Sequence, residues 1–304
     1  MGEQPGSQFR LMTYNIGGGR RDFGSATGVI AEVIGEAAPD ILVLQEVSDY
    51  QDADGAWHSV LDHIARARVG GQLVLLEHVQ FGPTLSMREH MHVRKTLFVR
   101  GIFNDWQDWR QGNAILSRRE FVRLGDPSKP GQPRNVPLYV PPLYEGNRDT
   151  DPRHALLARV NSAPVFPFVV GVHFTTLVAE RGLHPFPGRA EDAVTLRFRQ
   201  ARRLLDLLRE HVLETGEVVF LLGDFNAAST EPCIASVLEG EGGFMRLTPS
   251  NDDVATHSNT TGPIDHILIY PRSRVLEHRC WIVDTPAARR ASDHLPVVAD
   301  VTVC

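Results

Sequence analysis

The sequence is poor in cysteine, and the few thiols that it contains lie far apart. Among its 304 residues there are three cysteines, Cys233, Cys280 and Cys304, and no CxxC pair occurs. Disulfide frameworks and structural zinc sites both need several cysteines at short spacings. The spacing therefore predicts neither of them, and reduced thiols are expected.

Long apolar runs are also missing. No run reaches the roughly 18 residues that span a bilayer, and the first residues, MGEQPGSQFR, lack the apolar centre of a secretory signal. With 42% hydrophobic and 22% charged residues, the composition is that of an ordinary globular protein. We predict a cytoplasmic protein without a transmembrane segment, in which a polar lead of residues 1–8 precedes a single domain of residues 9–304.

An excess of positive charge is absent as well. Lysine and arginine number 31 against 37 acidic residues, which gives a formal net charge of −6. A protein that coats nucleic acid indiscriminately needs a basic face, so the charge argues against this class. It does not exclude a nuclease, because local arginine clusters can still contact phosphate.

What the sequence does contain is apolar runs that end in polar residues. The clearest run, Val218 to Leu222, has the length and composition of a strand buried on both faces, and Gly223 ends it. Asp224 is therefore expected at a sheet edge, with Asn226 two residues later. A carboxylate at this place must be solvated, paired or bound to a cation, because burying it bare is costly.

The same pattern recurs along the chain. Polar residues flank five further predicted strands: Asn15 after residues 11–14, Gln45 and Glu46 after 41–44, His173 after 169–172, Asp265 and His266 at the start of another strand, and Asp293 and His294 before the last one. A single strand followed by Gly-Asp is also an ordinary turn. Six such sites together predict that ligand and acid–base side chains gather at strand ends.

In this order, the motifs resemble those of the metal-dependent endonuclease/exonuclease/phosphatase superfamily. The resembling stretches are TYNI (13–16), LQEV (44–47), GNAILSR (112–118), HFTT (173–176), GDFNA (223–227), IDHILI (264–269) and SDHLPV (292–297). They follow the family's order and cover nearly the whole chain. The combination of GDFN with a C-terminal SDHLP is specific.

The resemblance implies an α/β fold, a four-layer α/β/β/α sandwich of two packed mixed β-sheets with helices outside. It also implies dependence on Mg²⁺ or Mn²⁺, with Glu46 as the main metal ligand and Asn15 and Asp293 beside it. Oxygen donors of this hardness suit those cations better than zinc.

The resemblance also implies catalytic roles. Asp224, with Asn226 as its neighbour, is expected to orient and deprotonate a water molecule. His294 and His173 would contact the scissile phosphate from the other side, as protonated imidazoles or as hydrogen-bond donors. Asp265 would fix the tautomer of His294. No partner of His173 is evident, and His266 is assigned to the following strand and not to the site.

Two further residues are candidates for phosphate contact. Asn113 in GNAILSR either contacts phosphate or only caps a turn. Arg153 stands where an arginine contacts phosphate in the deoxyribonuclease branch of the family. The chain lacks the closely spaced cysteine pair of that branch, and it has His173 where the apurinic-site repair branch has other polar side chains. It is therefore most similar to deoxyribonuclease-like, sphingomyelinase-like and deadenylase-like members.

Substrate choice is expected to lie in three insertions, near residues 82–111, 125–152 and 177–192. The second holds seven of the 20 prolines and is either an ordered excursion or a mobile lid. The first has basic residues, which form a solvated face or contact an anionic substrate, and two tryptophans, which stack on a base or lie in the core. The charged and aromatic candidates are Arg88, His90, His92, Arg94, Trp106 and Trp109 in the first insertion, and Arg181, His184 and Arg189 in the third.

Helical spacing is clearest in residues 194–212. An inward apolar stripe is predicted there at Val194, Phe198, Ala201, Leu205, Leu208 and Val212, with Arg197, Arg199, Arg202 and Arg203 facing solvent. Arg289 and Arg290 are expected in a loop before the last strand.

These observations predict a divalent-metal-dependent phosphodiesterase in which an activated water attacks in line, most readily a nuclease on DNA or RNA and a monomer. An alternative substrate is a lipid head group, an inositol phosphate or another small phosphoester. A non-catalytic interaction module of the same fold is a third possibility, disfavoured because all the acids and histidines of the motifs are present.

Overall fold

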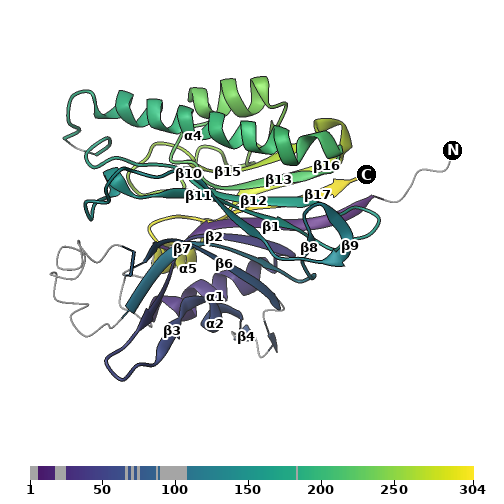
Figure 1. Ribbon diagram of the computed structural model, residues 1–304, viewed down its shortest axis with the longest axis horizontal. Coiled ribbons are helices and arrows are strands. Elements are labelled where there is room, and N and C mark those ends of the chain that lie inside the picture. Colours follow the sequence, from purple (N-terminus) through teal and green to yellow (C-terminus); the bar gives the residue numbers. More distant parts are fainter. Residues whose placement is uncertain are drawn as a thin grey trace.

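A computed structural model of the protein describes residues 6–17, 25–65, 68–69, 72–73, 76–86, 88–89, 108–182 and 184–304. Two large mixed β-sheets lie face to face, and helices cover the outer side of each (Figure 1). The predicted four-layer α/β/β/α sandwich is confirmed. None of the described helices is long and apolar enough to cross a bilayer.

The first sheet has the strand order β16-β17-β1-β2-β7-β6, with β3 paired to β2. Its strands are β1 (Ser7–Asn15), β2 (Ile41–Gln51), β3 (Trp57–Ser59), β6 (His78–Ser86), β7 (Asp108–Ser117), β16 (Val275–Ile282) and β17 (Val297–Val303). Strands β1 and β2 are parallel, while β17 is antiparallel to β1 and β7 is antiparallel to β2. The start of β17 therefore lies at the same edge as the ends of β1 and of the first half of β2.

The second sheet has the order β10-β11-β12-β13-β15-β14. Its strands are β10 (Arg134–Tyr139), β11 (Arg153–Arg159), β12 (Phe168–His173), β13 (Val219–Asp224), β14 (Met245–Arg246) and β15 (Asp265–Tyr270). Two small two-stranded sheets stand apart, made of β4 (Arg68–Val69) with β5 (Gln72–Leu73) and of β8 (Val122–Arg123) with β9 (Asp126–Pro130).

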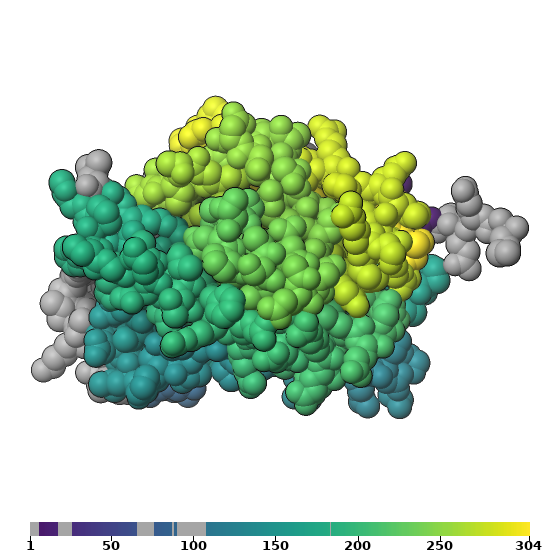
Figure 2. Space-filling model, turned by 90° about the horizontal axis from the view of Figure 1, so that it is seen from above, coloured from purple at the N-terminus to yellow at the C-terminus, as the bar shows by residue number. Residues whose placement is uncertain are grey.

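Helices form the outer layers. The helices α1 (Ser25–Ala37), α2 (Val60–Ala65) and α5 (Pro286–Ala291) lie outside the first sheet, while α4 (Arg189–His211) and the π-helical η5 (Cys233–Glu241) cover the second. Figure 2 looks down on this second outer face, where the green atoms of α4 and η5 conceal the sheet. Short 3₁₀ turns are η3 (Arg148–Thr150), η4 (Leu213–Thr215) and η6 (Arg272–Arg274).

The two sheets pack closely enough to hold the strand ends in fixed relative positions. Phe9 of β1 and Phe220 of β13 meet across the interface in an edge-to-face contact, with ring centroids 5.2 Å apart. At Gly171 of β12, an added Cβ would lie 2.7 Å from Cγ1 of Val43 in β2. Because interiors packed this tightly resist sliding, the sandwich is a rigid support for side chains at its edge.

The predicted orientation of α4 is wrong at two residues. Arg197, expected to face solvent, is buried, and Phe198, expected to face the core, is 37% exposed. The buried face carries Ala193, Arg197, Gln200, Ala201, Leu204, Leu205 and Leu208. Carboxylates of Glu180 and Glu231 bind the Arg197 guanidinium at 3.0 Å each, which compensates for burying its charge.

The second of the predicted insertions has regular secondary structure. Residues 125–152 form β9, β10 and η3, and β10 pairs with β11 as an edge strand, so this segment is an ordered excursion. Arg289 and Arg290 lie on α5 instead of in a loop, and Trp109 is buried in β7. His90, His92, Arg94 and Trp106 lie outside the described residues.

Candidate active site

The strand register brings the polar residues to one edge of the sandwich. In the second sheet, His173 is the direct neighbour of Asp224, and Asp224 is the direct neighbour of Asp265. These three residues occupy the ends of β12 and β13 and the start of β15, and all are buried. The sheet therefore presents two carboxylates and an imidazole in one row.

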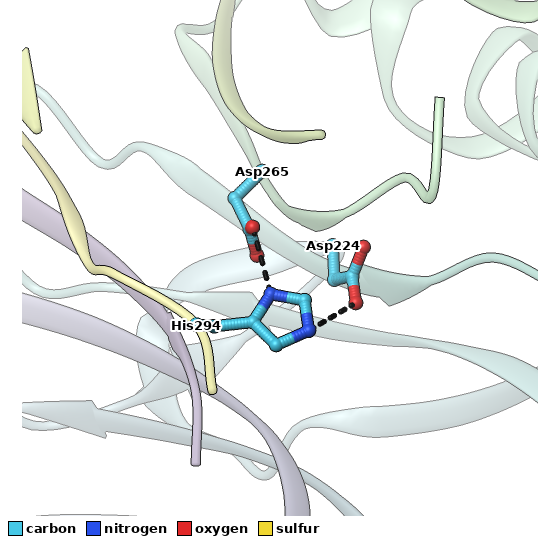
Figure 3. A group of neighbouring side chains, drawn as sticks. All are labelled: Asp224, Asp265 and His294. Atoms are coloured by element: carbon cyan, nitrogen blue, oxygen red, sulfur yellow. Dashed lines mark hydrogen bonds and ion pairs between the residues drawn. The ribbon is translucent and has the colours of Figure 1, made fainter. Parts of the chain in front are cut away.

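His294 reaches this row from the other sheet. It lies in the segment before β17, and its Nδ1 is 2.9 Å from Oδ2 of Asp265. Its Nε2 is 3.7 Å from Oδ2 of Asp224. Figure 3 shows the ring standing between the two carboxylates, with an interaction drawn to each. The predicted pairing of His294 with Asp265 is thus present in the geometry.

The electrostatics favour a protonated His294. Burial by itself lowers the pKa of this imidazole, but the charges of Asp265 and Asp224, the hydrogen bond with Asp265 and the charge of Asp293 outweigh it and raise the pKa to about 10. Burial and repulsion from Asp265 raise the pKa of Asp224 above its ordinary value, despite the opposing effect of His294. The ring therefore acts as a cation between two acids at neutral pH.

His173 has the opposite tendency. Burial, followed by the charges of Arg153 and His294, lowers the pKa of this imidazole well below 6.5, so it is neutral at pH 7. Its Nε2 lies 3.5 Å from Oδ2 of Asp224. The sequence suggested no partner for His173, and the structure identifies Asp224 as its neighbour.

Asn15 joins the two sheets. Its Nδ2 donates to Oδ2 of Asp224 at 3.0 Å and lies 3.4 Å from Oε1 of Glu46. Its Oδ1 accepts from the backbone N–H of Gly17 at 3.0 Å. The carbonyl of Asn15 accepts a hydrogen bond from Ser292 Oγ at 2.8 Å, which ties the segment before β17 to the end of β1. The side-chain amide of Asn15 thus contacts both Glu46 of the first sheet and Asp224 of the second.

A local irregularity in β2 presents Glu46. The register of β2 against β7 shifts between Leu44 and Val47, and Glu46 in this bulge adopts a left-handed φ of 55°. A bulge turns a side chain away from the regular alternation of the strand. A left-handed φ is unfavourable for a residue with a Cβ, and such backbone is concentrated at functional sites.

The residues predicted as metal ligands fit a hard divalent cation. Glu46 and Asn15 are adjacent, and Asp293 lies against the turn that follows Asn15, since a Cβ added to Gly17 would be 3.1 Å from Asp293 Oδ1. The side chain of Asp293 is 46% exposed and open to a ligand. Carboxylate and amide oxygens are ligands that Mg²⁺ or Mn²⁺ accepts; in this structure Nδ2 of Asn15 faces Glu46, while its Oδ1 accepts from the backbone N–H of Gly17.

A second group of donors lies deeper. Single ligand atoms of Asp224, Asp265 and His294 lie within 4.8 Å of one another. The hydrogen bond with Asp265 already engages Nδ1 of this histidine, and the raised pKa favours a proton on the ring. A protonated imidazole repels a cation. Two sets of donors are therefore candidates for a cation, this deeper group and the set of Glu46, Asn15 and Asp293.

Asn226 sits in a strained turn after β13. Its φ is 49°, and its backbone N–H donates to Oδ1 of Asp224 at 2.8 Å. Its side-chain Nδ2 donates to the carbonyl of Phe174 at 3.1 Å. Its Oδ1 lies 3.4 Å from Nη1 of Arg181, and its carbonyl accepts from Nη2 of the same arginine. Arg181 thus belongs to the site, although sequence reasoning placed it only within an insertion.

His257 is a neighbour that the sequence did not reveal. Its ring contacts that of His294 edge to face with centroids 4.7 Å apart, and its Nε2 is 3.8 Å from Asp293 Oδ2. Burial and the charge of His294 lower its pKa. An open pocket of about 420 Å³ adjoins it, lined by residues 253–258, Arg289, Ser292, Asp293 and Leu295. In the sequence, His257 lies only in the polar stretch of residues 256–262 before IDHILI, which has no periodicity that would predict its position.

The two predicted phosphate contacts are both buried. Asn113 in β7 donates from Nδ2 to the carbonyl of His154 at 3.3 Å, so it holds β7 to β11 across the two sheets. Arg153 lies 3.3 Å from Asp151 through Nη2, its charge reaches His173, and its Nε has no hydrogen-bond partner among the described residues. His266 belongs to β15, as expected, and its Nε2 donates to the carbonyl of Ala227 at 2.8 Å.

Solved structures support the fold. An endonuclease/exonuclease/phosphatase from Beutenbergia cavernae is 22% identical, with a TM-score of 0.67, over 97% of this chain and 72% of that chain. The human Nocturnin catalytic domain with bound sulfate anion is 18% identical, with a TM-score of 0.65, over 98% and 95%. Truncated TDP2 from Caenorhabditis elegans is 16% identical, with a TM-score of 0.60, over 97% and 98%. At these identities the likeness establishes the fold.

Sequence comparison gives the family. A search of curated proteins finds no match. The sequence model of the endonuclease/exonuclease/phosphatase family matches residues 12–294. This range includes every motif from TYNI to the histidine of SDHLPV. The chain therefore belongs to the endonuclease/exonuclease/phosphatase family and has its phosphoesterase fold, with a possible metal-binding site at the edge of the sandwich.

Proposed function

We propose that the protein is a divalent-metal-dependent phosphodiesterase that hydrolyses its substrate by in-line attack of water, with nucleic acid as the substrate. The observation that carries this proposal is the convergence of Asp224, Asp265 and His294 from two sheets, with Glu46 joined to Asp224 through Asn15. Phosphoester hydrolysis needs a positioned water and positive charge beside the phosphoryl oxygens. The geometry supplies groups for both.

Asp224 is the group proposed to orient the water and take its proton. Its raised pKa is closer to neutral than that of an ordinary carboxylate, which improves a general base. Asn15 and the backbone of Asn226 donate to its two oxygens and fix its orientation. The second Nδ2 hydrogen of Asn226, not used by Phe174, is available to the same water.

His294 and His173 are proposed to bind the phosphate in two different forms. The raised pKa of His294 makes Nε2 a cationic donor, while Asp265 holds Nδ1 and prevents the ring from turning. His173, whose pKa is lowered, is a neutral donor or acceptor. Arg153 adds positive charge beside His173, and its buried Nε has no hydrogen-bond partner among the described residues.

Glu46, Asn15 and Asp293 are proposed to hold Mg²⁺ or Mn²⁺. When bound, the cation would neutralise phosphoryl charge and stabilise the leaving oxygen. Glu46 is fixed for this purpose by its bulge and by Asn15, so the ligand does not need to reorganise on binding. A cytoplasmic location and a monomeric state stay predictions from the sequence.

A second class of substrate is favoured by exposed apolar side chains on the insertions. Among the described residues seven large apolar side chains are exposed, and four of them lie in two insertions: Val140, Leu143, Val178 and Phe186. Asp149 ties the two insertions together, since it accepts from the backbone N–H of Val178 at 2.7 Å and pairs with Arg189. Exposed apolar groups of this kind often mark a binding surface, and here they favour a phosphoester with an apolar part, such as a lipid.

A substrate screen tests the proposal. Purified protein is incubated with single- and double-stranded DNA and RNA, with phospholipids and with inositol phosphates, each with Mg²⁺, Mn²⁺ or EDTA. We expect metal-dependent cleavage of nucleic acid and a loss of about 10² to 10⁴ in kcat for Asp224→Asn. Asp300→Asn is the matched control, because Asp300 pairs with Arg10 at a half-exposed position on the first sheet.

Three results would change the conclusion. Turnover of phospholipid without cleavage of nucleic acid would transfer the function to the second class, and Phe186→Ser should then reduce turnover of phospholipid but not of bis(p-nitrophenyl) phosphate. Equal rates for Asp224→Asn and the control would remove the role assigned to Asp224. Full activity in EDTA after exhaustive dialysis would reject the metal dependence.

A further inference from the structure

Arg181 is a charged residue at the site that the proposed chemistry does not yet use. It comes from the segment after β12, and its guanidinium lies against the turn that follows β13. Nη1 is 3.4 Å from Oδ1 of Asn226, and Nη2 donates to the carbonyl of Asn226. Nη2 is also 2.9 Å from Oε1 of Glu180. Asn226 also contacts the proposed general base, Asp224, so a single residue separates the guanidinium of Arg181 from that carboxylate.

A buried network holds Arg181 in this place. Glu180 is 5% exposed and accepts from the backbone N–H of Leu177 at 2.9 Å. Its two carboxylate oxygens also accept from Nη1 of Arg197, at 3.0 and 3.1 Å. Arg197 is itself held by Glu231, which follows the GDFNA turn. The network thus connects the insertion, α4 and the turn of Asn226. An arginine supported in this way keeps its position without a ligand.

Arg181 also fixes which end of the Asn226 amide faces which neighbour. A guanidinium only donates, so the amide atom beside it must be Oδ1, while the carbonyl of Phe174 only accepts and must face Nδ2. Exchange of the two ends would place two donors together and two acceptors together. Arg181 therefore keeps Oδ1 of Asn226 on its own side and Nδ2 on the side of Phe174.

The guanidinium retains capacity for a ligand. It has five N–H groups, and its contacts with Asn226 and Glu180 engage three of them among the described residues. Its side chain is 25% exposed, so it is not sealed in the core. A partly exposed guanidinium with free N–H groups matches a phosphate oxygen in charge and geometry.

We propose that Arg181 is a substrate-binding residue, which takes an oxygen of a substrate phosphate on the Asn226 side of the site. This inference rests on the proposed phosphoesterase function and makes it more specific. The substrate then meets two arginines from different elements, Arg153 of β11 and Arg181 of the insertion after β12. The chemical class that fits is a phosphoester whose phosphate keeps its negative charge and can accept several donors at once.

The test compares Arg181→Gln and Arg181→Lys with Arg199→Gln. Arg199 is an exposed arginine on α4, so its replacement removes the same charge from the same region without touching Asn226. Hydrolysis of bis(p-nitrophenyl) phosphate with Mn²⁺ gives KM and kcat. We expect Arg181→Gln to raise KM by about tenfold to a hundredfold, because a charged hydrogen bond is lost. Arg181→Lys should recover part of this rise, and Arg199→Gln should stay within about twofold.

A second measurement does not depend on turnover. Inorganic phosphate at fixed concentration, in EDTA, should raise the melting temperature of the wild type and of Arg199→Gln, and should raise that of Arg181→Gln by much less. Equal KM values in Arg181→Gln and Arg199→Gln together with equal phosphate-induced shifts would overturn the proposal. A loss of kcat alone, with KM and the phosphate shift unchanged, would overturn it as well, because Arg181 would then act only through Asn226.

The two proposals fail in different ways. If the wild type hydrolyses no phosphoester but phosphate stabilises it through Arg181, the proposed function fails and the anion-binding role stands. If hydrolysis is robust and indifferent to Arg181, the role of this arginine fails and the function stands.

Discussion

Replacing Asp265 with asparagine should move the pH dependence of the enzyme, because this carboxylate is the main group that keeps His294 protonated. The pair is 2.9 Å apart, and both side chains are buried. Asp265→Asn removes a charge while its Oδ1 can still accept from Nδ1 of the ring. The change therefore tests the electrostatic role of Asp265 with little change in shape.

The size of the effect follows from the contacts. Removing one partner of a buried charged pair costs about 3–5 kcal/mol, and one pKa unit corresponds to about 1.4 kcal/mol, so the pKa of His294 should fall by about two to four units. Starting from about 10, it would lie between about 6 and 8 in the variant. Burial, the largest influence that lowers this pKa, would then be opposed mainly by Asp224.

The raised pKa of His294 also makes the stability of the folded protein depend on pH. The folded protein holds the His294 proton up to a pH of about 10, whereas an unfolded histidine loses it near 6.5. Between these values the folded state binds more protons, so the contribution of His294 to the free energy of unfolding is complete below pH 6.5 and is lost as pH rises towards 10. In Asp265→Asn the pH range over which His294 contributes to the free energy of unfolding should become narrower or disappear.

The assay is a pH–rate profile of kcat/KM from pH 5.5 to 10 with saturating Mn²⁺, for the wild type, Asp265→Asn and the control Asp300→Asn. We expect the alkaline limb of Asp265→Asn to move to lower pH, so that the deficit against the wild type grows by about tenfold or more between pH 6 and pH 9. A deficit that is the same at every pH would show that Asp265 does not act by holding a proton on His294, and the reasoning would be refuted.

Two other substitutions test the ligands and the supporting network. Glu46→Gln should raise the Mn²⁺ concentration needed for half-maximal activity by about tenfold to a hundredfold, and an unchanged metal titration would show that Glu46 is not a ligand. Arg197→Met should lower the free energy of unfolding in urea by about 3–5 kcal/mol, because Glu180 loses its buried partner. A wild-type urea midpoint would contradict the account of this network.

Much of the edge of the sandwich follows from local sequence. Asp224 and His173 could be placed at strand ends because each comes directly after an apolar run, and β12 and β13 are in fact neighbours in register. The layer order came from the family resemblance and is confirmed. Periodicity and strand ends carry this information because they depend on residues close together in the chain.

The remainder depends on contacts that are distant in sequence. Arg197 is one of four arginines that suggest a solvated helix face, and its burial depends on Glu180 and Glu231, 17 and 34 residues away, and on the carbonyl of Thr175. Arg181 and His257 lie in segments without periodicity, so nothing local indicates that they approach Asn226 and His294. The left-handed backbone of Glu46 also results from the register with β7, which the residues of β2 do not encode alone.

The division of the reactive groups between the sheets has a consequence for folding. Asn15 and Asp224 are 209 positions apart and belong to different sheets, and His294, in the segment that leads into β17 of the first sheet, contacts Asp265 of the second. A partly folded molecule, or one whose layers have separated, holds only half of the machinery. Under the proposed function, hydrolysis should therefore begin only when the two layers have closed on each other, and a partly folded molecule should be inactive toward phosphoesters.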